Sequence, residues 1–486
     1  MSINKQSQTP IFDTLLSRSK RKVVSFHTPG HKNGKGVDKR LRQYTGKSSY
    51  YFDVTVFPEV DSLHDPVGPI RKSQALMAEA YGVGHSFFLV NGSTVGNQAM
   101  LLSACNPGDS VIVSRNAHKS ILAGIILSGV WPIWIQPGVD QNLDILFDPM
   151  PEQIESALHQ FPEAKAVLIT SPTYNGITAD LVKISEIVHR HGKVLLVDEA
   201  HGPHLKFHDE LPISAVEAGA DMCVQSTHKI LSALSQGSVL HVNSELIDIN
   251  RVKKVVSMLQ TTSPNYMILA SIDLARRQAV QSGEKIIDRV IRIAEDGRKK
   301  INHLRHFFSF TRKEIQARGY DLDVTKVTIN VTKSGFSGRE IDSILAKEYD
   351  IQVDASDLFN LIAILGIGSD KTDMTRLVHA LEDIDVKYHG TAKNWILQIP
   401  SLTTEMVMMP REVFLSKRTK RTPITKAAGH ISAQTLTPYP PGIPVLIPGE
   451  RITKEICDYL MNLTEKELRV SGQETDTLRT IKVVAL

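Results

Sequence analysis

The chain has 486 residues, of which 42% are hydrophobic and 22% are charged, a composition typical of a globular protein with two or three domains. The formal net charge of +4 is small for this length, and the basic runs at 17–22 and 416–422 are typical of solvated surface, so we expect no nucleic-acid partner. The N-terminus lacks a secretory apolar core, and no stretch reaches about 18 apolar residues, so we expect a soluble, cytoplasmic protein without membrane contact. Three widely spaced cysteines predict buried thiols in a reducing compartment.

From residue 86 the sequence alternates between short apolar runs and helical patterns. Several runs are apolar at consecutive positions, as expected for strands that are covered on both faces. Helical patterns such as "LVKISEIVHRHG" separate them. This alternation predicts an α/β fold with a mostly parallel sheet and helices on both faces. The predicted strands are 86–90, 110–114, 131–136, 166–170, 194–198, 222–226 and 238–242.

Residues 265–307 show a continuous helical pattern, and the pattern changes after about residue 320. A smaller α+β part is predicted there from the strand "KVTINVT", the helix "SGREIDSILAKEY" and the strand "WILQI". The prolines in 437–450 preclude a regular helix and favour an extended, packed loop. We therefore predict an N-terminal segment (1–70), a large domain (71–320) and a small C-terminal α+β domain (321–486).

A turn of Gly92, Ser93 and Thr94 follows the first predicted strand and opens a helix. Free amides at the helix start, the helix dipole and two hydroxyls make a phosphate cradle. The alternative is an ordinary Ser/Thr helix cap. A Walker loop is excluded because its GK[ST] element is missing.

Asp198 ends a predicted strand at the carboxyl edge, where open α/β sheets bind ligands. An acid there needs a positive partner. One candidate partner is a metal, because His201 and His204 are near, but no cluster has zinc spacing and we expect no metal. The other candidate partner is a protonated ring nitrogen. Lys229 follows 31 residues later, about one βαβ step, so Asp198 and Lys229 should lie at neighbouring strand ends.

An aspartate for a pyridinium, a lysine for an imine and a hydroxyl-rich helix start are the protein groups that pyridoxal phosphate requires. Their order along the chain therefore predicts this cofactor. His118 follows the strand 110–114 and is expected at the same edge, where its ring could stack on the cofactor; the alternative is a surface histidine. Thr173 follows the strand 166–170 and belongs to the same predicted edge.

The chain resembles the Orn/Lys/Arg decarboxylase family of fold type I pyridoxal phosphate enzymes, in the short form without an N-terminal wing domain that includes the biosynthetic arginine decarboxylases. The resemblance spans residues 26–450, and "FHTPGHK", "STVGNQAM" and "QSTHK" in sequence are highly specific. The matching stretches are "FHTPGHKNG", "DSLHDPVGPI", "FFLVNGSTVGNQAM", "RNAHKS", "SPTYNG", "VDEAHGPH", "QSTHK" and "YPPGIPVLIPGE".

The resemblance implies a role for each matching residue. Lys229 would bind the cofactor covalently, Asp198 would hold its ring nitrogen protonated, and His118 and Ala200 would lie on opposite ring faces. Lys229 or His228 would return a proton to the substrate carbon. The catalytic set is thus Lys229, Asp198, His118 and His228. The rest of the cofactor site would comprise the phosphate ligands Ser93, Thr94, Ser226 and His228, together with Val95, Thr173 and His201.

The resemblance also implies a homodimer or higher oligomer with active sites at the subunit interface. Segment 1–70 would contribute to the dimer and the site entrance, and "TTSPNY" would reach the neighbouring site with Thr262. Three positions depart from the family pattern: His201 replaces a tryptophan of the larger members, His430 an arginine and Ser62 an acid.

The implied reaction is decarboxylation of a basic amino acid, most simply arginine to agmatine in polyamine biosynthesis. Lysine or ornithine as substrate, an aminotransferase or aldolase on the same fold, and a non-catalytic protein are the alternatives. A cationic side chain needs an acidic partner. The candidate acids, which the sequence does not rank, are Asp354, Asp357 and Glu450. We predict Asp354 and Thr262 as substrate-binding residues.

Overall fold

The structure is a computed structural model that describes residues 3–21, 23–140, 145–387, 404–438, 443–465, 470–473 and 478–485. The chain divides into two compact units, and neither is a continuous segment. The first unit comprises residues 1–104, 194–291 and 366–369; the second comprises 105–193, 292–365 and 370–486. The division predicted at residues 70 and 320 stays a prediction.

Four strands in the first unit lie in the order β1 (His85–Leu89), β10 (Ser238–Val242), β9 (Met222–Gln225) and β8 (Val194–Asp198). β10 is antiparallel to both neighbours, while β8 and β9 are parallel. β9 and β10 are antiparallel because their connection contains only the short helix α9 (Thr227–Ile230) and no crossover helix. The carboxyl ends of β1, β8 and β9 therefore meet at one edge.

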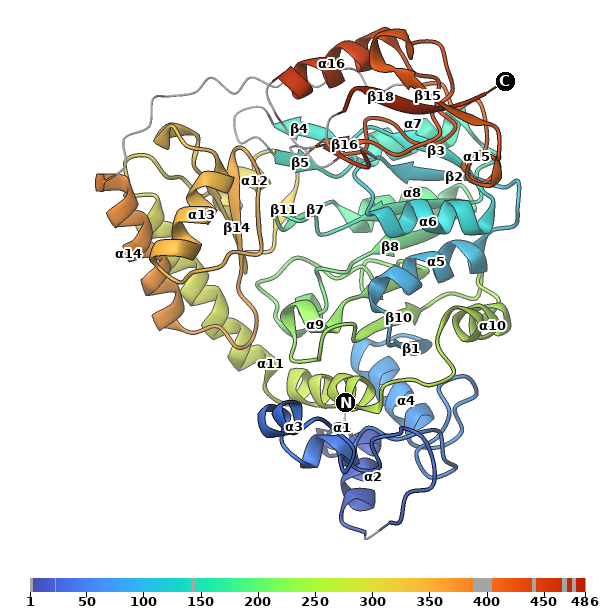
Figure 1. The fold of residues 1–486 in the computed structure, drawn as a ribbon, viewed down its shortest axis with the longest axis vertical. Coiled ribbons are helices and arrows are strands. Elements are labelled where there is room, and N and C mark those ends of the chain that lie inside the picture. Colours follow the sequence, from blue (N-terminus) through green and yellow to red (C-terminus); the bar gives the residue numbers. More distant parts are fainter. Residues whose placement is uncertain are drawn as a thin grey trace. The chain divides into compact units, whose positions relative to one another are not determined.

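Helices cover these strands. α5 (Gly92–Ala104) packs on the strands, and α10 (Ile249–Leu259) contacts α5 (Figure 1). Gly96 allows the close contact of α5 with β9, because a Cβ there would lie 2.3 Å from Cγ2 of Val224. α4 (Pro69–Tyr81) packs against β1. The other short helices of this unit are α1 (Ile3–Gln6), α2 (Pro10–Ser19), α3 (Lys39–Thr45), η1 (Ser48–Tyr51) and η2 (Leu205–Phe207).

A buried ion pair ties the N-terminal residues to the long helix α11 (Tyr266–Ile301). Arg276 and Asp273 are 1% and 0% exposed and lie 3.1 Å apart. Arg276 also donates to the backbone and side-chain oxygens of Gln6, and Asp273 accepts from the amide of Ile11. These hydrogen bonds satisfy two charges that would otherwise be costly to bury.

The second unit contains three parallel strands in the order β6 (Ala166–Thr170), β2 (Ser110–Ser114) and β3 (Trp131–Ile135). Helices α7 (Pro151–Gln160) and α8 (Leu181–Arg190) contact each other. The remaining elements between residues 105 and 193, and two that contact them, are α6 (Lys119–Ser128), β4 (Gly138–Asp140), β5 (Ile145–Phe147), β7 (Ile177–Thr178), β11 (Asp321–Leu322) and α15 (Pro410–Leu415).

Later elements of the second unit form a smaller antiparallel sheet and a C-terminal core. In the sheet, β14 (Asn360–Ile364) lies between β12 (Lys326–Asn330) and β13 (Ala355–Ser356). The C-terminal core gathers buried side chains such as Val445, Leu460 and Ile481. The other elements are α12 (Arg312–Gln316), η3 (Thr332–Ser334), α13 (Gly338–Glu348), α14 (Lys371–Lys387), β15 (Thr419–Pro423), η4 (Ile424–Lys426), β16 (Thr437–Pro438), α16 (Lys454–Glu465), β17 (Val470–Ser471) and β18 (Thr480–Val484).

The seven strands predicted before residue 243 are confirmed to within one residue at each end, and the predicted mostly parallel α/β class is confirmed. The helix predicted at 265–307 is present as α11 but ends at Ile301. The described part of 437–450 contains no helix, as predicted, and Val445 is fully buried. The predicted strand "WILQI" and residues 439–442 lie outside the described residues. Among the described helices, none combines the length and apolarity needed to cross a membrane.

Candidate active site

Three chain segments converge at the carboxyl edge of the first unit's strands. Asp198 is the last residue of β8 and pairs in register with Val224 of β9, which confirms the adjacency predicted from the 31-residue spacing. Ser226 and Lys229 follow β9 directly, and the turn at Gly92 follows β1. The sheet therefore brings together residues that are more than 130 positions apart in the sequence.

The turn before α5 presents hydroxyl groups at a helix start. Gly92 adopts a φ of +69°, a left-handed conformation that favours glycine, and its amide donates to the carbonyl of Gln236 at 2.9 Å. Ser226 Oγ donates to Ser93 Oγ at 3.0 Å, which joins the segment after β9 to this turn. Thr94 is exposed and Val95 is buried. Hydroxyls and free amides at a helix N-terminus suit a phosphate group.

Asp198 is a buried carboxylate with neutral donors. Its side chain is 2% exposed, Asn97 Nδ2 donates to Oδ2 at 2.7 Å, and the amide of Ala200 donates to Oδ1 at 3.2 Å. Its negative charge helps to raise the pKa of the buried Cys223 thiol, although burial and the neighbouring Glu199 contribute more. A buried carboxylate held by neutral groups suits a cationic ligand atom.

Two histidines lie near Lys229: His201 contacts its amine, and His228 precedes it in the sequence. Lys229 Nζ lies 2.7 Å from Nε2 of His201, which is buried. His228 Nδ1 donates to the carbonyl oxygen of Gly237 at 2.9 Å. The pKa of His228 is lowered, mainly by burial and further by the charge of Lys229, while the Gly237 carbonyl opposes this shift. His228 is therefore biased toward the neutral imidazole.

Thr262, also in the first unit, is exposed in the segment before α11. His64 holds this segment through contacts with Ser257 Oγ at 2.7 Å and the Thr261 carbonyl at 2.8 Å. Ala200 is buried, and its carbonyl accepts from the amide of Ser226 at 3.3 Å. Ala200 thus lies between Asp198 and the segment of Lys229.

The other predicted site residues belong to the second unit. His118 is exposed and caps α6, where its Nδ1 accepts from the Ser120 amide. Thr173 is buried, and its Oγ1 accepts from the amide of Ile177 at 3.2 Å. Asp354 is exposed, and Tyr174 Oη donates to it. Their predicted roles stay predictions.

Comparison with known proteins places this arrangement in a family. The major domain of Orn/Lys/Arg decarboxylases matches residues 9–373, and the C-terminal domain of the same enzymes matches residues 394–479. The chain belongs to the Orn/Lys/Arg decarboxylase family. It is 37% identical to an arginine decarboxylase of Bacillus anthracis, over 99% of this chain and 98% of the relative. It is 38% identical to an arginine decarboxylase of Bacillus subtilis, over 99% and 98% of the two chains.

Solved structures support the fold. Lysine decarboxylase A from Pseudomonas aeruginosa matches with a TM-score of 0.85 and 24% identity, over 99% of this chain and 81% of that one. At this identity the likeness shows the fold alone. The predicted family and fold class are therefore confirmed.

Two of the three candidate substrate acids already have partners within the protein. Glu450 is fully buried and forms a bidentate ion pair with Arg115, at 2.5 and 2.8 Å, and accepts from the Ile447 amide. Asp357 accepts from the amides of Phe359 and Asn360, and burial raises its pKa to about 6. Asp354, by contrast, is exposed.

Sequence reasoning missed Asn97 and Glu199. Asn97 lies within "STVGNQAM", but no local pattern marks its contact with Asp198, which is 101 residues away. Glu199 is fully buried and accepts from Gln225 Nε2 at 2.6 Å and the Ala215 amide at 2.7 Å. Burial raises the pKa of Glu199 to about 8 despite these donors. Asp198 and Glu199 are thus adjacent carboxyl groups in different environments.

The raised pKa of Glu199 predicts a pH dependence of stability. Between its ordinary value of 4.5 and about 8, the folded state binds one proton more at this site than the unfolded state. The contribution of Glu199 to the free energy of unfolding is therefore full below pH 4.5 and falls as the pH rises to about 8. Glu199→Gln should remove this contribution to the slope. Urea unfolding from pH 5 to 8 would measure it, and parallel profiles for parent and variant would contradict the assignment.

Proposed function

We propose that this protein is a pyridoxal phosphate-dependent decarboxylase that converts arginine to agmatine, in the cytoplasm and as a step of polyamine biosynthesis. The observation that carries the proposal is the convergence of Lys229, Asp198 and the Ser93 turn at one sheet edge. Relatives named arginine decarboxylase, 37–38% identical over nearly the whole chain, support the substrate.

The side chains at this edge fit pyridoxal phosphate. The α5 start and the Ser93–Ser226 pair offer amides and hydroxyls to a phosphate. Asp198 offers a buried negative charge to a protonated ring nitrogen, and Lys229 offers an amine to the aldehyde. An exposed lysine or an acid already paired with a cation would not fit; here Asp198 has neutral donors and Lys229 is partly buried.

When bound, the cofactor supplies an electron sink for the bond between Cα and the carboxylate. Asp198 would hold the proton at the ring nitrogen and so stabilise the negative charge that develops as this bond breaks. Asn97 and the Ala200 amide fix the orientation of Asp198. Lys229 Nζ would deliver the proton that returns to Cα; His228, whose Nδ1 donates to Gly237, could deliver it through Nε2 only when its imidazole is protonated.

Of the three candidate acids, we propose Asp354 as the group that binds the substrate side chain. Glu450 is neutralised by Arg115, and Asp357 caps a turn through two amides. Asp354 directly precedes β13 and is exposed, and the hydroxyl of Tyr174 donates to one of its carboxylate oxygens. A guanidinium is recognised best by a carboxylate held in a fixed orientation.

Arginine should be decarboxylated at least about tenfold more efficiently than lysine or ornithine, because an ammonium leaves acceptors of a guanidinium site unpaired. Asp354→Asn should raise the arginine KM strongly with less effect on kcat. Carbon dioxide release from the three amino acids in parallel would measure both effects. Asp350→Asn, an exposed acid four residues earlier, is the matched control. Equal efficiency on lysine would contradict arginine as the substrate, and the absence of carbon dioxide release would favour an aminotransferase or aldolase.

We further propose that the protein acts as a homodimer or higher oligomer with its sites at the subunit interface. Segment 1–70 exposes large apolar side chains, including Phe26 at 94% and Tyr44 at 90%. Such exposure is typical of an association surface.

The oligomer proposal predicts that activity depends on protein concentration. Dilution to a concentration at which monomers prevail should remove activity, since Thr262 and segment 1–70 would no longer reach a neighbouring site. Sedimentation velocity alongside the carbon dioxide assay would test this. A fully active monomer would contradict the proposal.

A further inference from the structure

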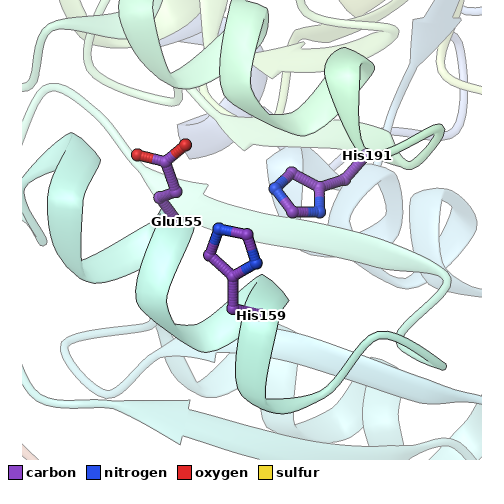
Figure 2. Close-up of side chains that lie close together, drawn as sticks. All are labelled: Glu155, His159 and His191. Carbon is purple, nitrogen blue, oxygen red and sulfur yellow. The ribbon is translucent and has the colours of Figure 1, made fainter.

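Glu155, His159 and His191 bring three possible metal ligands together in the second unit (Figure 2). Glu155 and His159 lie four positions apart on α7, so they share one helix face. His191 directly follows the last residue of α8, the helix that contacts α7. The carboxylate oxygen and the two imidazole nitrogens lie within 4.8 Å of one another.

We propose that Glu155, His159 and His191 bind a divalent transition-metal ion such as Zn²⁺. Two imidazoles and one carboxylate are ligands that Zn²⁺ accepts, with bonds of roughly 2.0–2.2 Å and a fourth position left for water. Mg²⁺ and Ca²⁺ prefer sites made only of oxygen ligands. The chemistry of this set therefore selects a borderline metal.

The side chains need only a small movement to reach coordination distance. Ligand atoms of a tetrahedral zinc site are roughly 3.4 Å apart, given its bond lengths. His159 is exposed, and Glu155 and His191 are half-buried, so rotation about side-chain bonds can close the remaining gap. The two imidazole rings already lie in edge-to-face contact, with centroids 4.9 Å apart.

Arg190 competes with the metal for Glu155. Its Nη1 donates to Glu155 Oε1 at 3.1 Å, but the two side chains are 63% and 34% exposed. Exposed ion pairs are weak. Metal binding would replace this pair, and removal of the arginine should therefore strengthen binding.

The sequence predicts no metal site, because no cluster has zinc spacing. His191 lies 32 residues after His159, and only the packing of α8 on α7 makes them neighbours. None of the three residues belongs to the candidate active site, so this proposal stands independently of the decarboxylase function. A bound ion would link the two helices and stabilise the folded state through mass action.

Isothermal titration calorimetry of the cofactor-loaded protein with ZnCl₂ tests the site. The parent should bind Zn²⁺, and His159→Ala or His191→Ala should weaken this binding at least about tenfold. Loss of even an outer-shell partner of a metal ligand costs about this factor in affinity, and these two residues are proposed as direct ligands. His189→Ala, an exposed histidine on the last turn of α8, is the matched control and should bind as the parent does. Arg190→Gln should bind severalfold more tightly.

Thermal unfolding gives an independent measurement. Zn²⁺ should raise the unfolding midpoint of the parent, EDTA should reverse the increase, and His191→Ala should show no increase from this site. The increased affinity of Arg190→Gln does not depend on a destabilised variant, so misfolding cannot mimic it. A parent that binds no Zn²⁺, or alanine variants that bind it as tightly as the parent, would overturn the proposal.

Discussion

Lys229→Ala should lower turnover by about 10⁴-fold or more, because it removes the amine that would bind the cofactor. Lys229 follows β9 at the edge where Asp198 ends β8, its side chain is only partly buried, and its Nζ lies 2.7 Å from Nε2 of His201. The folded state should therefore survive the substitution. Carbon dioxide release would measure turnover, and circular dichroism would report the fold.

Borohydride labelling makes this test specific. Reduction of the cofactor-loaded parent should fix the label on Lys229, and the variant should take up no label at that position. Lys254→Ala, an exposed lysine on α10, is the matched control and should be labelled and active like the parent. Labelling of a different lysine in the parent would show that Lys229 does not carry the cofactor.

Individual strands and helices were predictable because their patterns are local. The run 194–198 is apolar at four consecutive positions and ends in an acid, and β8 occupies this range. Likewise, the helix at 181–190 has apolar residues at helical spacing and a glycine soon after its end. Hydrophobic periodicity and turn residues carry such information within a single segment.

Contacts between distant segments were not predictable in this way. The direction of β10 depends on the lack of a crossover helix after β9, and no local pattern specifies this direction. The pairing of Glu450 with Arg115 joins positions 335 residues apart, and it removes from consideration an acid that the sequence left as a substrate candidate. The raised pKa of Glu199 arises from burial and cannot be read from the motif "VDEAHG".

Asp198→Asn should lower kcat by about 10²–10³-fold while changing the KM much less, because the lost interaction acts on charge that develops in the transition state. An amide cannot keep a pyridine nitrogen protonated. The replacement has nearly the same shape, so the hydrogen bond from the Ala200 amide can remain with the amide oxygen. Steady-state kinetics of the purified, cofactor-loaded variant would separate the effect on kcat from the effect on KM.

The adjacent residue provides the control for this prediction. Glu199 is as deeply buried as Asp198, but its pKa of about 8 keeps it mainly protonated at neutral pH. Glu199→Gln therefore replaces one neutral group by another and should leave kcat near that of the parent. If Asp198→Asn retained the parental kcat, Asp198 would not hold the ring nitrogen. If both variants lost the same factor, the loss would reflect burial at this edge rather than a negative charge on Asp198.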